Sequence, residues 1–245
     1  MDVEGRTILI TGASRGIGAA TARHLAAQGA RVALMARDAD ALHALAEETG
    51  GVALPGDVSD WETVAGAVET LGEVHGLMNN AGLIDPIARI EDSDPAAWAR
   101  VVNVNLTGAY NALRAVLPGM RARGEGVVVN ISSGAATGAL EGWSHYCATK
   151  AALLSLTRCA QKELEGTGVH VVGLSPGTVA TDMQRAIKAS GINPVSQLDW
   201  DRHIPAQDVA KAVAWLFAEG APRHAGGDFS LKTPEGRAEA GLAPL

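Results

Sequence analysis

Short apolar segments alternate with longer helical segments along the whole chain, and this alternation limits the fold more than any other feature. Most apolar segments are continuous rather than interrupted by polar residues, which is typical of strands covered on both faces. The pattern predicts an α/β fold in which about seven strands form a parallel, doubly wound sheet with helices on both faces. The expected strands are Thr7–Ile10, Arg31–Met35, Val52–Leu54, Gly76–Met78, Val127–Ile131, Val169–Leu174 and Asp228–Lys232.

Helical periodicity predicts the segments that connect these strands. Ser59 and Glu62 are spaced as a capping box, and Asp94-Pro95 fits an N-cap followed by proline at the first helical position. No linker, repeat or low-complexity run interrupts the pattern, so we expect residues 1–245 to form a single domain. The expected helices are Ile17–Gln28, Asp60–Leu71, Asp94 to about Met120, Tyr146–Glu165 and Pro205–Ala218.

Charge and cysteine content exclude several classes of protein. The chain has 20 Lys and Arg against 27 Asp and Glu, a net charge of −7, with no long basic run. This balance argues against nucleic acid or an anionic membrane as a partner. Cys147 and Cys159 lie about 18 Å apart along one predicted helix, too far to pair, and no metal-binding spacing occurs. With no signal peptide or transmembrane segment expected, the prediction is a reduced, cytoplasmic protein without a metal.

A glycine cluster follows the first strand and opens the first helix. Gly12 permits a tight turn, Gly16 allows close approach to a pyrophosphate, and Gly18 lets the helix pack on the sheet. The amides at the helix N-terminus would then face the anion. The spacing G-x-x-x-G-x-G departs from the common fingerprint G-x-G-x-x-G. The position between strand and helix favours a Rossmann-type dinucleotide site over an ordinary turn.

The turn after the second strand bears on the choice of dinucleotide. It carries Ala36, Arg37 and Asp38. Arg37 can pair bidentately with a 2′-phosphate, and Arg15 in the glycine loop can approach the same group, which favours NADP (NADPH). In the alternative, Arg37 is a surface residue and Asp38 holds the ribose, so that NAD is the less favoured cofactor.

A tyrosine and a lysine four residues apart begin the fourth predicted helix. This spacing places Tyr146 and Lys150 on one helical face. A neighbouring ammonium favours phenolate, so Lys150 is expected to lower the tyrosine pKa from its ordinary value of about 10. Ser133, thirteen residues before Tyr146, ends a strand and can hydrogen-bond a substrate carbonyl. Ser132 is expected to cap the strand end, and His145 to be a wall or surface residue.

At this point the chain resembles the short-chain dehydrogenase/reductase family over nearly all of its 245 residues. The similarity rests on several motifs in order along the chain. These are Thr11–Gly18 as T-G-x-x-x-G-I-G, Asp57-Val58, the N-N-A-G turn at 79–82, Asn105 in N-V-N-L-T-G, the Ser133, Tyr146 and Lys150 set, and Pro176-Gly177 with Thr181.

The resemblance implies a mechanism and a set of site residues. Tyr146 would give a proton to a carbonyl oxygen as hydride arrives at its carbon, and Ser133 would position that oxygen. Lys150 would hold the nicotinamide ribose, and Asn105 would fix a relay water. The expected catalytic residues are Asn105, Ser133, Tyr146 and Lys150. The expected cofactor-binding residues are Gly12, Ser14, Arg15, Gly16, Ile17, Gly18, Arg37, Asp57, Val58, Asn80, Ala81, Gly82, Tyr146, Lys150, Pro176, Gly177, Val179 and Thr181.

The substrate-binding segments carry weaker signals. The expected substrate wall is Leu83, Ile84, Trp143 and Met183, with a lid around residues 182–203 whose apolar members include Ile187, Leu198 and Trp200. Ordinary packing of a short helix explains those apolar residues equally well. The stretch Gly142–Cys147 is also loosely similar to benzil reductases and sepiapterin-reductase-like proteins. The segment His224–Lys232 departs from the family's usual I-T-G-Q and V-D-G-G pattern, which puts the usual tetramer contacts in doubt.

Three functions remain open on this basis. An NADPH-dependent carbonyl reductase of bulky ketones or α-diketones is favoured, because the expected pocket is apolar and aromatic. A β-ketoacyl thioester reductase or polyol dehydrogenase of the same family is the alternative. A nucleotide-binding regulator is disfavoured, since a sensor has no need to keep Tyr146 and Lys150 together. The expected partners are a small-molecule carbonyl substrate and further copies of the chain, in a dimer or tetramer.

Overall fold

The computed structural model describes residues 1–244 and contains one parallel sheet. The spatial order is β3-β2-β1-β4-β5-β6-β7, and every neighbouring pair is parallel. The predicted doubly wound α/β fold is therefore confirmed, although β7 ends at Ser230 rather than Lys232. The strands are β1 (Thr7–Thr11), β2 (Arg31–Ala36), β3 (Val52–Pro55), β4 (Gly76–Asn79), β5 (Gly126–Ile131), β6 (Val169–Ser175) and β7 (Asp228–Ser230).

Helices occupy most of the connections between strands. All five predicted helices are present, whereas α2, which lies between β2 and β3, was not predicted. The α-helices are α1 (Gly16–Ala26), α2 (Ala39–Thr49), α3 (Trp61–Leu71), α4 (Pro95–Val102), α5 (Gly108–Arg123), α6 (Ser144–Glu163), α7 (Asp182–Ser190), α8 (Ala206–Trp215), α9 (Ala221–His224) and α10 (Pro234–Glu239). Shorter turns are the 3₁₀ segments η1 (Ile90–Asp92), η3 (Gly134–Ala136), η4 (Pro194–Gln197) and η5 (Trp200–Arg202), and the π segments η2 (Asn103–Thr107) and η6 (Leu216–Gly220).

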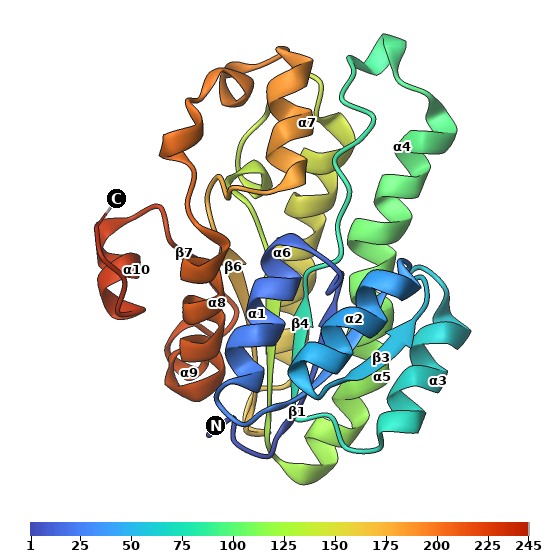
Figure 1. Ribbon diagram of the computed structural model, residues 1–245, viewed down its shortest axis with the longest axis vertical. Helices are drawn as coiled ribbons and strands as arrows, with labels where there is room; N and C mark the ends of the chain where they lie inside the picture. The colour runs from blue at the N-terminus through green and yellow to red at the C-terminus, as the bar shows by residue number, and fades with distance from the viewer. Residues whose placement is uncertain (245) are drawn as a thin grey trace.

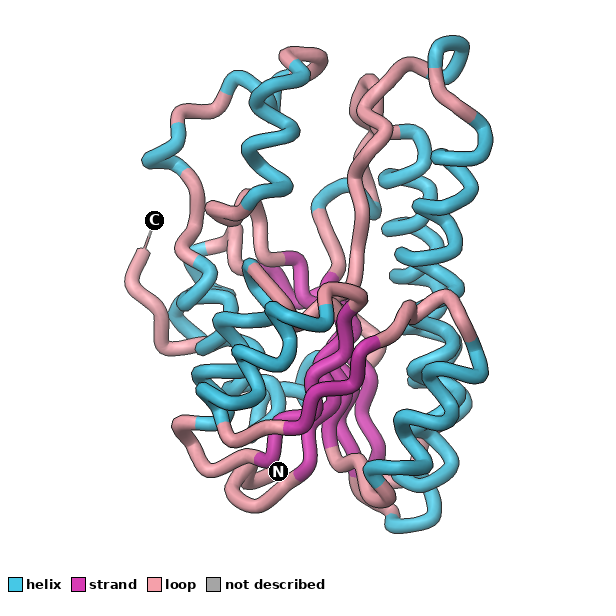
Figure 2. Tube along the Cα trace, turned by 45° about the vertical axis from the view of Figure 1, so that its right-hand side comes forward, coloured by secondary structure: helices cyan, strands magenta, loops and turns pink. Residues whose placement is uncertain are grey.

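Both faces of the sheet are covered, which explains why its central strands are mainly apolar without alternation. Successive side chains of a strand point to opposite faces. Ile8 and Ile10 belong to one hydrophobic cluster with residues of α1, α2 and α8, whereas Leu9 belongs to a second cluster with residues of α3, α5 and α6. Figure 2 shows the two helical layers on either side of the strands.

Aspartate side chains cap the N-termini of α2, α3 and α4. The Asp94 carboxylate accepts a hydrogen bond from the Ala97 N–H at 2.8 Å, and proline follows at the first helical position, as predicted. The predicted capping box at the start of α3 is wrong. Asp60 is the N-cap and accepts from the Glu62 N–H, while the Ser59 hydroxyl donates to Asp57 instead. The aspartate outcompetes the serine because it stands next to the first helical residue.

The helix predicted from Asp94 to about Met120 is interrupted by a π turn. α4 passes into η2 and then into α5, which continues to Arg123. The wider turn inserts one extra residue into the helical path, a distortion that occurs often at functional sites. Asn105 lies at the centre of this turn and is buried.

The strand order places a crevice at the carboxyl end of the sheet. From β1 the chain proceeds outward through β2 and β3, and it then returns to the other side of β1 with β4. Ligands of doubly wound sheets bind outside the carboxyl ends of the strands at such a reversal. In Figure 1 α7 and the start of α4 extend beyond the sheet at this end. Within residues 1–244, no helix combines the length and apolarity that a membrane span requires.

Candidate active site

Two adjoining cavities lie at the reversal of the strand order. The larger, of about 760 Å³, runs along the glycine loop and reaches Arg37 and Asp57. The smaller, of about 350 Å³, contains Ser133, Tyr146 and Lys150 in its wall. Both volumes fall in the range of roughly 300–1,000 Å³ that is typical of ligand sites. The two cavities share the wall residues Ile17, Asn80, Gly82, Thr181 and Met183.

The glycine loop is held in a conformation that side chains would disrupt. Gly12 and Gly16 have φ of +63° and +56°, a region that favours glycine. A Cβ on Gly18 would collide with the Gly12 carbonyl oxygen and lie 2.8 Å from the Asn80 amide nitrogen. That amide donates to the carbonyl oxygens of Thr11 and Gly12, each at 3.0 Å. Asn80 therefore fixes the loop from the neighbouring strand end.

The N-terminus of α1 suits an anion. Gly16 and Ile17, its first two residues, line the larger cavity. No side chain caps this helix and no acidic residue lies in its first turn, whereas α2, α3 and α4 each have an aspartate cap. The first N–H groups of a helix have no partners within it, and the helix dipole favours negative charge there. These residues fit the pyrophosphate of a dinucleotide.

Two arginines line the larger cavity, Arg15 in the glycine loop and Arg37 after β2. Arg37 Nη1 lies 4.0 Å from Asp57 Oδ2, and Arg15 Nη1 lies 3.9 Å from Asp182 Oδ2. Both contacts are long, so both guanidinium groups retain donors for another anion. Burial opposes ionisation of Asp57, but hydrogen bonds from Ser59 and the charge of Arg37 outweigh it and lower the pKa of this carboxyl. Asp38 accepts from the Ala41 N–H as the cap of α2.

The other residues predicted to bind cofactor divide between the two cavities. Ser14, Val58 and Ala81 line the larger cavity, which extends from the glycine loop to the end of β3. Pro176, Gly177 and Val179 line the smaller cavity, in the loop after β6. Val179 is bridged to Ile204, which ties this loop to the segment before α8. The structure thus places the two sets of predicted cofactor residues along one continuous crevice.

Tyr146 and Lys150 project from the first two turns of α6 into the smaller cavity. The Lys150 ammonium lies 5.5 Å from the centre of the Tyr146 ring and donates to the Ile131 carbonyl oxygen at 2.6 Å. Ser133 follows β5 two residues after Ile131 and hydrogen-bonds with Tyr146. The end of β5 therefore positions both the serine and the lysine around the tyrosine.

The expected lowering of the tyrosine pKa is wrong. Burial raises the pKa of Tyr146 to about 12, which the hydrogen bond with Ser133 only partly offsets. Burial also lowers the pKa of Lys150 to about 8, against the opposing effect of the Asp228 carboxylate. Desolvation disfavours the charged form of each group. The ammonium faces the tyrosine ring and the Ile131 carbonyl, so it does not offset the burial of the hydroxyl.

The Asn105 side chain joins three parts of the site. Its oxygen accepts from the Leu83 N–H at 2.7 Å, and its amide donates to the Leu83 carbonyl at 2.9 Å and to the Thr149 hydroxyl at 3.3 Å. The π turn thus holds the segment after the N-N-A-G turn against α6. That Asn105 also fixes a relay water stays a prediction.

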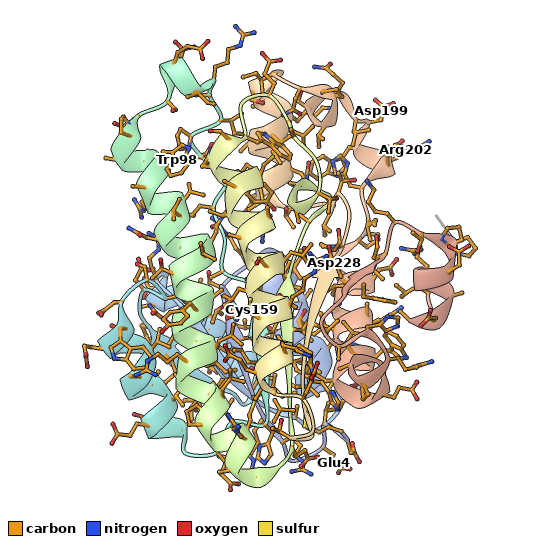
Figure 3. All side chains as sticks on the ribbon, turned by 180° about the vertical axis from the view of Figure 1, so that it is seen from behind. Glu4, Trp98, Cys159, Asp199, Arg202 and Asp228 are labelled. Atoms are coloured by element: carbon orange, nitrogen blue, oxygen red, sulfur yellow. The ribbon has the colours of Figure 1, made fainter. Side chains whose placement is uncertain are left out.

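Asp228 is a polar residue near the site that the sequence did not indicate. It lies beside α6 (Figure 3), accepts from the Ser132 hydroxyl at 3.1 Å, and opposes the lowering of the Lys150 pKa. Its position in the divergent C-terminal segment gave no signal. His145 is fully buried rather than on the surface, because its ring nitrogen bonds the Ile84 carbonyl oxygen at 2.6 Å.

The four residues predicted to form the substrate wall do not all line the same cavity. Trp143 and Met183 line the smaller cavity, together with Ile187, and the Trp143 and Tyr146 rings meet edge to face at 5.6 Å. Leu83 and Ile84 instead line the larger cavity. Leu198 and Trp200 lie outside both cavity walls, and Trp200 stacks on His203 at 4.8 Å. The apolar lid residues in the cavity wall come from α7 and η4, whereas Trp200 of η5 lies under the guanidinium group of Arg185, at 5.6 Å.

Sequence comparisons match this chain to one family of known proteins over most of its length. Residues 6–191 match the family described as short chain dehydrogenase. The chain is 33% identical to 2-(S)-hydroxypropyl-CoM dehydrogenase 3 of Xanthobacter autotrophicus, over 94% of this chain and 96% of that protein. It is also 33% identical to the 3-oxoacyl-(acyl-carrier-protein) reductase of Escherichia coli, over 90% and 93% of the two chains.

A solved structure of a protein with a similar sequence has a similar fold. The 3-ketoacyl-(acyl-carrier-protein) reductase from Brucella melitensis, complexed with NADH, matches with a TM-score of 0.83 and 29% identity, over 94% of this chain and 97% of that one. Each of these matches covers at least 90% of this chain and at least 90% of the protein compared. The chain belongs to the short-chain dehydrogenase/reductase family of oxidoreductases.

Proposed function

We propose that the protein is an NADPH-dependent carbonyl reductase that interconverts a bulky ketone or α-diketone and a secondary alcohol. The observation that carries this proposal is the position of Tyr146. It lies beside Ser133 and Lys150 in a mainly apolar cavity, which adjoins a groove that ends at Arg37. An apolar cavity suits the body of the substrate, and the few polar groups in its wall suit a single carbonyl.

The protein side chains supply the proton and hold the oxygen. Bound NADPH would supply hydride to the carbonyl carbon. Tyr146 donates its proton to the carbonyl oxygen, and its raised pKa of about 12 keeps it protonated in the free protein. Ser133 hydrogen-bonds the same oxygen, while Lys150, whose ammonium is held by the Ile131 carbonyl oxygen, would hold the nicotinamide ribose of the bound cofactor. Asn105 holds the neighbouring backbone and fixes a water that returns the proton.

Arg37 and Arg15 support NADP over NAD. Their guanidinium groups approach the groove where a ribose 2′-phosphate would lie, and their contacts to acidic partners are long. The acid beside them, Asp38, caps α2. One oxygen of Asp38 is engaged in that cap, whereas the guanidinium groups of Arg37 and Arg15 retain free donors, so the NAD alternative is less favoured.

A β-ketoacyl thioester reductase is the second candidate. It is favoured by the similarity to the Escherichia coli 3-oxoacyl-(acyl-carrier-protein) reductase over 90% of this chain. A thioester substrate would place its ketone at the same Tyr146 and Ser133, so the two candidates differ only in what the rest of the cavity holds. A polyol dehydrogenase is less favoured, because a polyol would leave most of its hydroxyl groups against apolar walls.

A substrate panel tests the proposal. NADPH consumption is measured with benzil, aryl ketones, acetoacetyl thioesters and sugars, using the wild type and Tyr146→Phe. We expect turnover of benzil or an aryl ketone to exceed that of the others, with at least a hundredfold loss in the variant. Higher kcat/KM for the acetoacetyl thioester would select the second candidate, and no turnover of any carbonyl would reject both.

A further inference from the structure

A lysine from the divergent C-terminal segment reaches the mouth of the smaller cavity. Lys232 is exposed and lines this cavity together with Ser133 and Tyr146. Its stem lies on Gly177, where an added Cβ would come within 3.1 Å of the lysine Cγ. Its ammonium lies 4.0 Å from the position of a Cβ on Gly134. The side chain thus crosses from the loop after β6 to the loop that follows Ser133.

The cavity provides no negative charge for this ammonium. Among residues 1–244, Lys232 Nζ forms no ion pair and no side-chain hydrogen bond, and the wall contains neither aspartate nor glutamate. The other cation in the wall, Lys150, donates to the Ile131 carbonyl oxygen. Asp228 is the carboxylate near Lys150, and it accepts from Ser132. An anion that entered the cavity would therefore meet a free ammonium at its mouth.

The rest of the wall defines what lies between the anion and the carbonyl. Leu140, Trp143, Ile187 and Val195 are apolar and line the same cavity. The ammonium faces Gly134, the residue directly after Ser133, and consecutive Cα atoms are about 3.8 Å apart. Because Ser133 lines the same cavity of about 350 Å³, one small molecule could carry both a charge bound by Lys232 and a carbonyl bound by Ser133.

We propose that Lys232 is a specificity-determining residue that binds an anionic group on the substrate, so that the preferred substrates are ketones carrying a carboxylate, sulfonate or phosphate close to the carbonyl. This inference rests on the proposed carbonyl reduction and narrows its substrate class. The ammonium pairs with the anion at the mouth, the apolar wall takes the hydrocarbon body, and Tyr146 and Ser133 hold the ketone oxygen.

Matched substrates test this assignment. For each of several keto acids, kcat and KM are compared with those of the uncharged primary amide of the same acid, using NADPH. The wild type should prefer the keto acid by roughly 3–10-fold in kcat/KM, mainly through KM, since an exposed ion pair contributes about 1 kcal/mol. The preference should shrink in high salt because the ammonium is exposed.

Three variants separate the charge from the packing. Lys232→Met removes the ammonium and keeps an apolar stem, so its preference for the keto acid over the amide should fall to within about twofold, mainly through a higher KM for the keto acid. Lys232→Arg keeps the charge and should keep the preference. Lys211→Met, on α8 and outside both cavity walls, is the matched control and should behave as the wild type. A preference that survives in Lys232→Met would overturn the proposal, as would a wild type that prefers the amides.

Calorimetry distinguishes failure of this inference from failure of the proposed reaction. Binding of a keto acid and of its amide is measured in the presence of NADP⁺, for the wild type and Lys232→Met. Tighter binding of the keto acid that Lys232→Met abolishes supports the anion site even if no ketone is reduced. Equal binding of both compounds to the wild type rejects the anion site, whether or not ketones are reduced.

Discussion

Arg37 stands one residue beyond the carboxyl end of β2 and lines the larger cavity, where we expect the adenosine of a bound dinucleotide to lie. Arg37→Asp replaces a donor for a 2′-phosphate with an acceptor for a 2′-hydroxyl. The variant should raise KM for NADPH by at least tenfold and shift the ratio of kcat/KM values towards NADH. Arg31→Asp, at the opposite end of the same strand, should leave the ratio unchanged. Equal kcat/KM for the two cofactors in the wild type would contradict the role of Arg37.

Lys150 carries a stability cost that its function requires. Its pKa of about 8 lies below the ordinary 10.5, so at pH 7 the folded state must hold an unfavourable buried charge. Lys150→Met removes that charge and one hydrogen bond, and should raise the free energy of unfolding at pH 7 by about 1–3 kcal/mol while abolishing turnover. The gain should vanish as the pH rises from 8 to above 10.5, where the lysine is neutral in both states. Thermal unfolding at pH 7 and pH 10.5 measures this difference, and a variant less stable than the wild type at pH 7 would contradict it.

That Ser133, Tyr146 and Lys150 lie together could be predicted from spacing and resemblance, but their electrostatics could not. Spacing places a lysine near a tyrosine, yet only the fold shows that the ammonium faces the ring and the Ile131 carbonyl rather than the hydroxyl. Asp228 was missed for the same reason, because 78 residues separate it from Lys150 and only the sheet brings the two together.

At the scale of elements, α4, η2 and α5 form one continuous helical path. Two features distinguish it, the Asp94 cap at its start and the π turn around Asn105. Asp94→Ala removes the cap and should cost about 1 kcal/mol of stability without changing kcat/KM. Asn105→Ala leaves the buried backbone groups of Leu83 without their partner, and should cost about 1–3 kcal/mol as well as lower kcat/KM. Thermal unfolding and steady-state kinetics of the two variants test this contrast. Equal effects of both on activity would show that the π turn has no role beyond stability.

Strands and helices were predicted correctly where burial requires a run of apolar residues. The prediction failed where one residue sets the local backbone geometry of a helix. The strands of the sheet are recognisable because both of their faces are buried. The π turn has no signature in composition, since it inserts one residue into an otherwise regular helical pattern. Asp60 and Ser59 are both good N-caps, and their local backbone geometry chooses between them.

At the scale of the whole molecule, the reversal of strand order joins the cofactor groove to the reaction site. The glycine loop follows β1, Asn80, which fixes that loop, comes directly after β4, and Ser133 lies two residues after the end of β5. These three strands are neighbours in the sheet, so their carboxyl ends converge on the two cavities. The sheet thus determines which residues meet, whereas α7 and the C-terminal segment complete the wall of the smaller cavity.

The most direct test of the central claim follows hydride to the product while removing the proposed proton donor. NADPH carrying deuterium at nicotinamide C4, in each configuration, is supplied with benzil or the best ketone of the panel, and the alcohol is analysed by mass spectrometry. The wild type should transfer deuterium from one configuration only to the carbinol carbon. Tyr146→Phe should bind NADPH within a few-fold of the wild type and form product at least a hundredfold more slowly. Product without deuterium, or a Tyr146→Phe rate close to that of the wild type, would contradict the account.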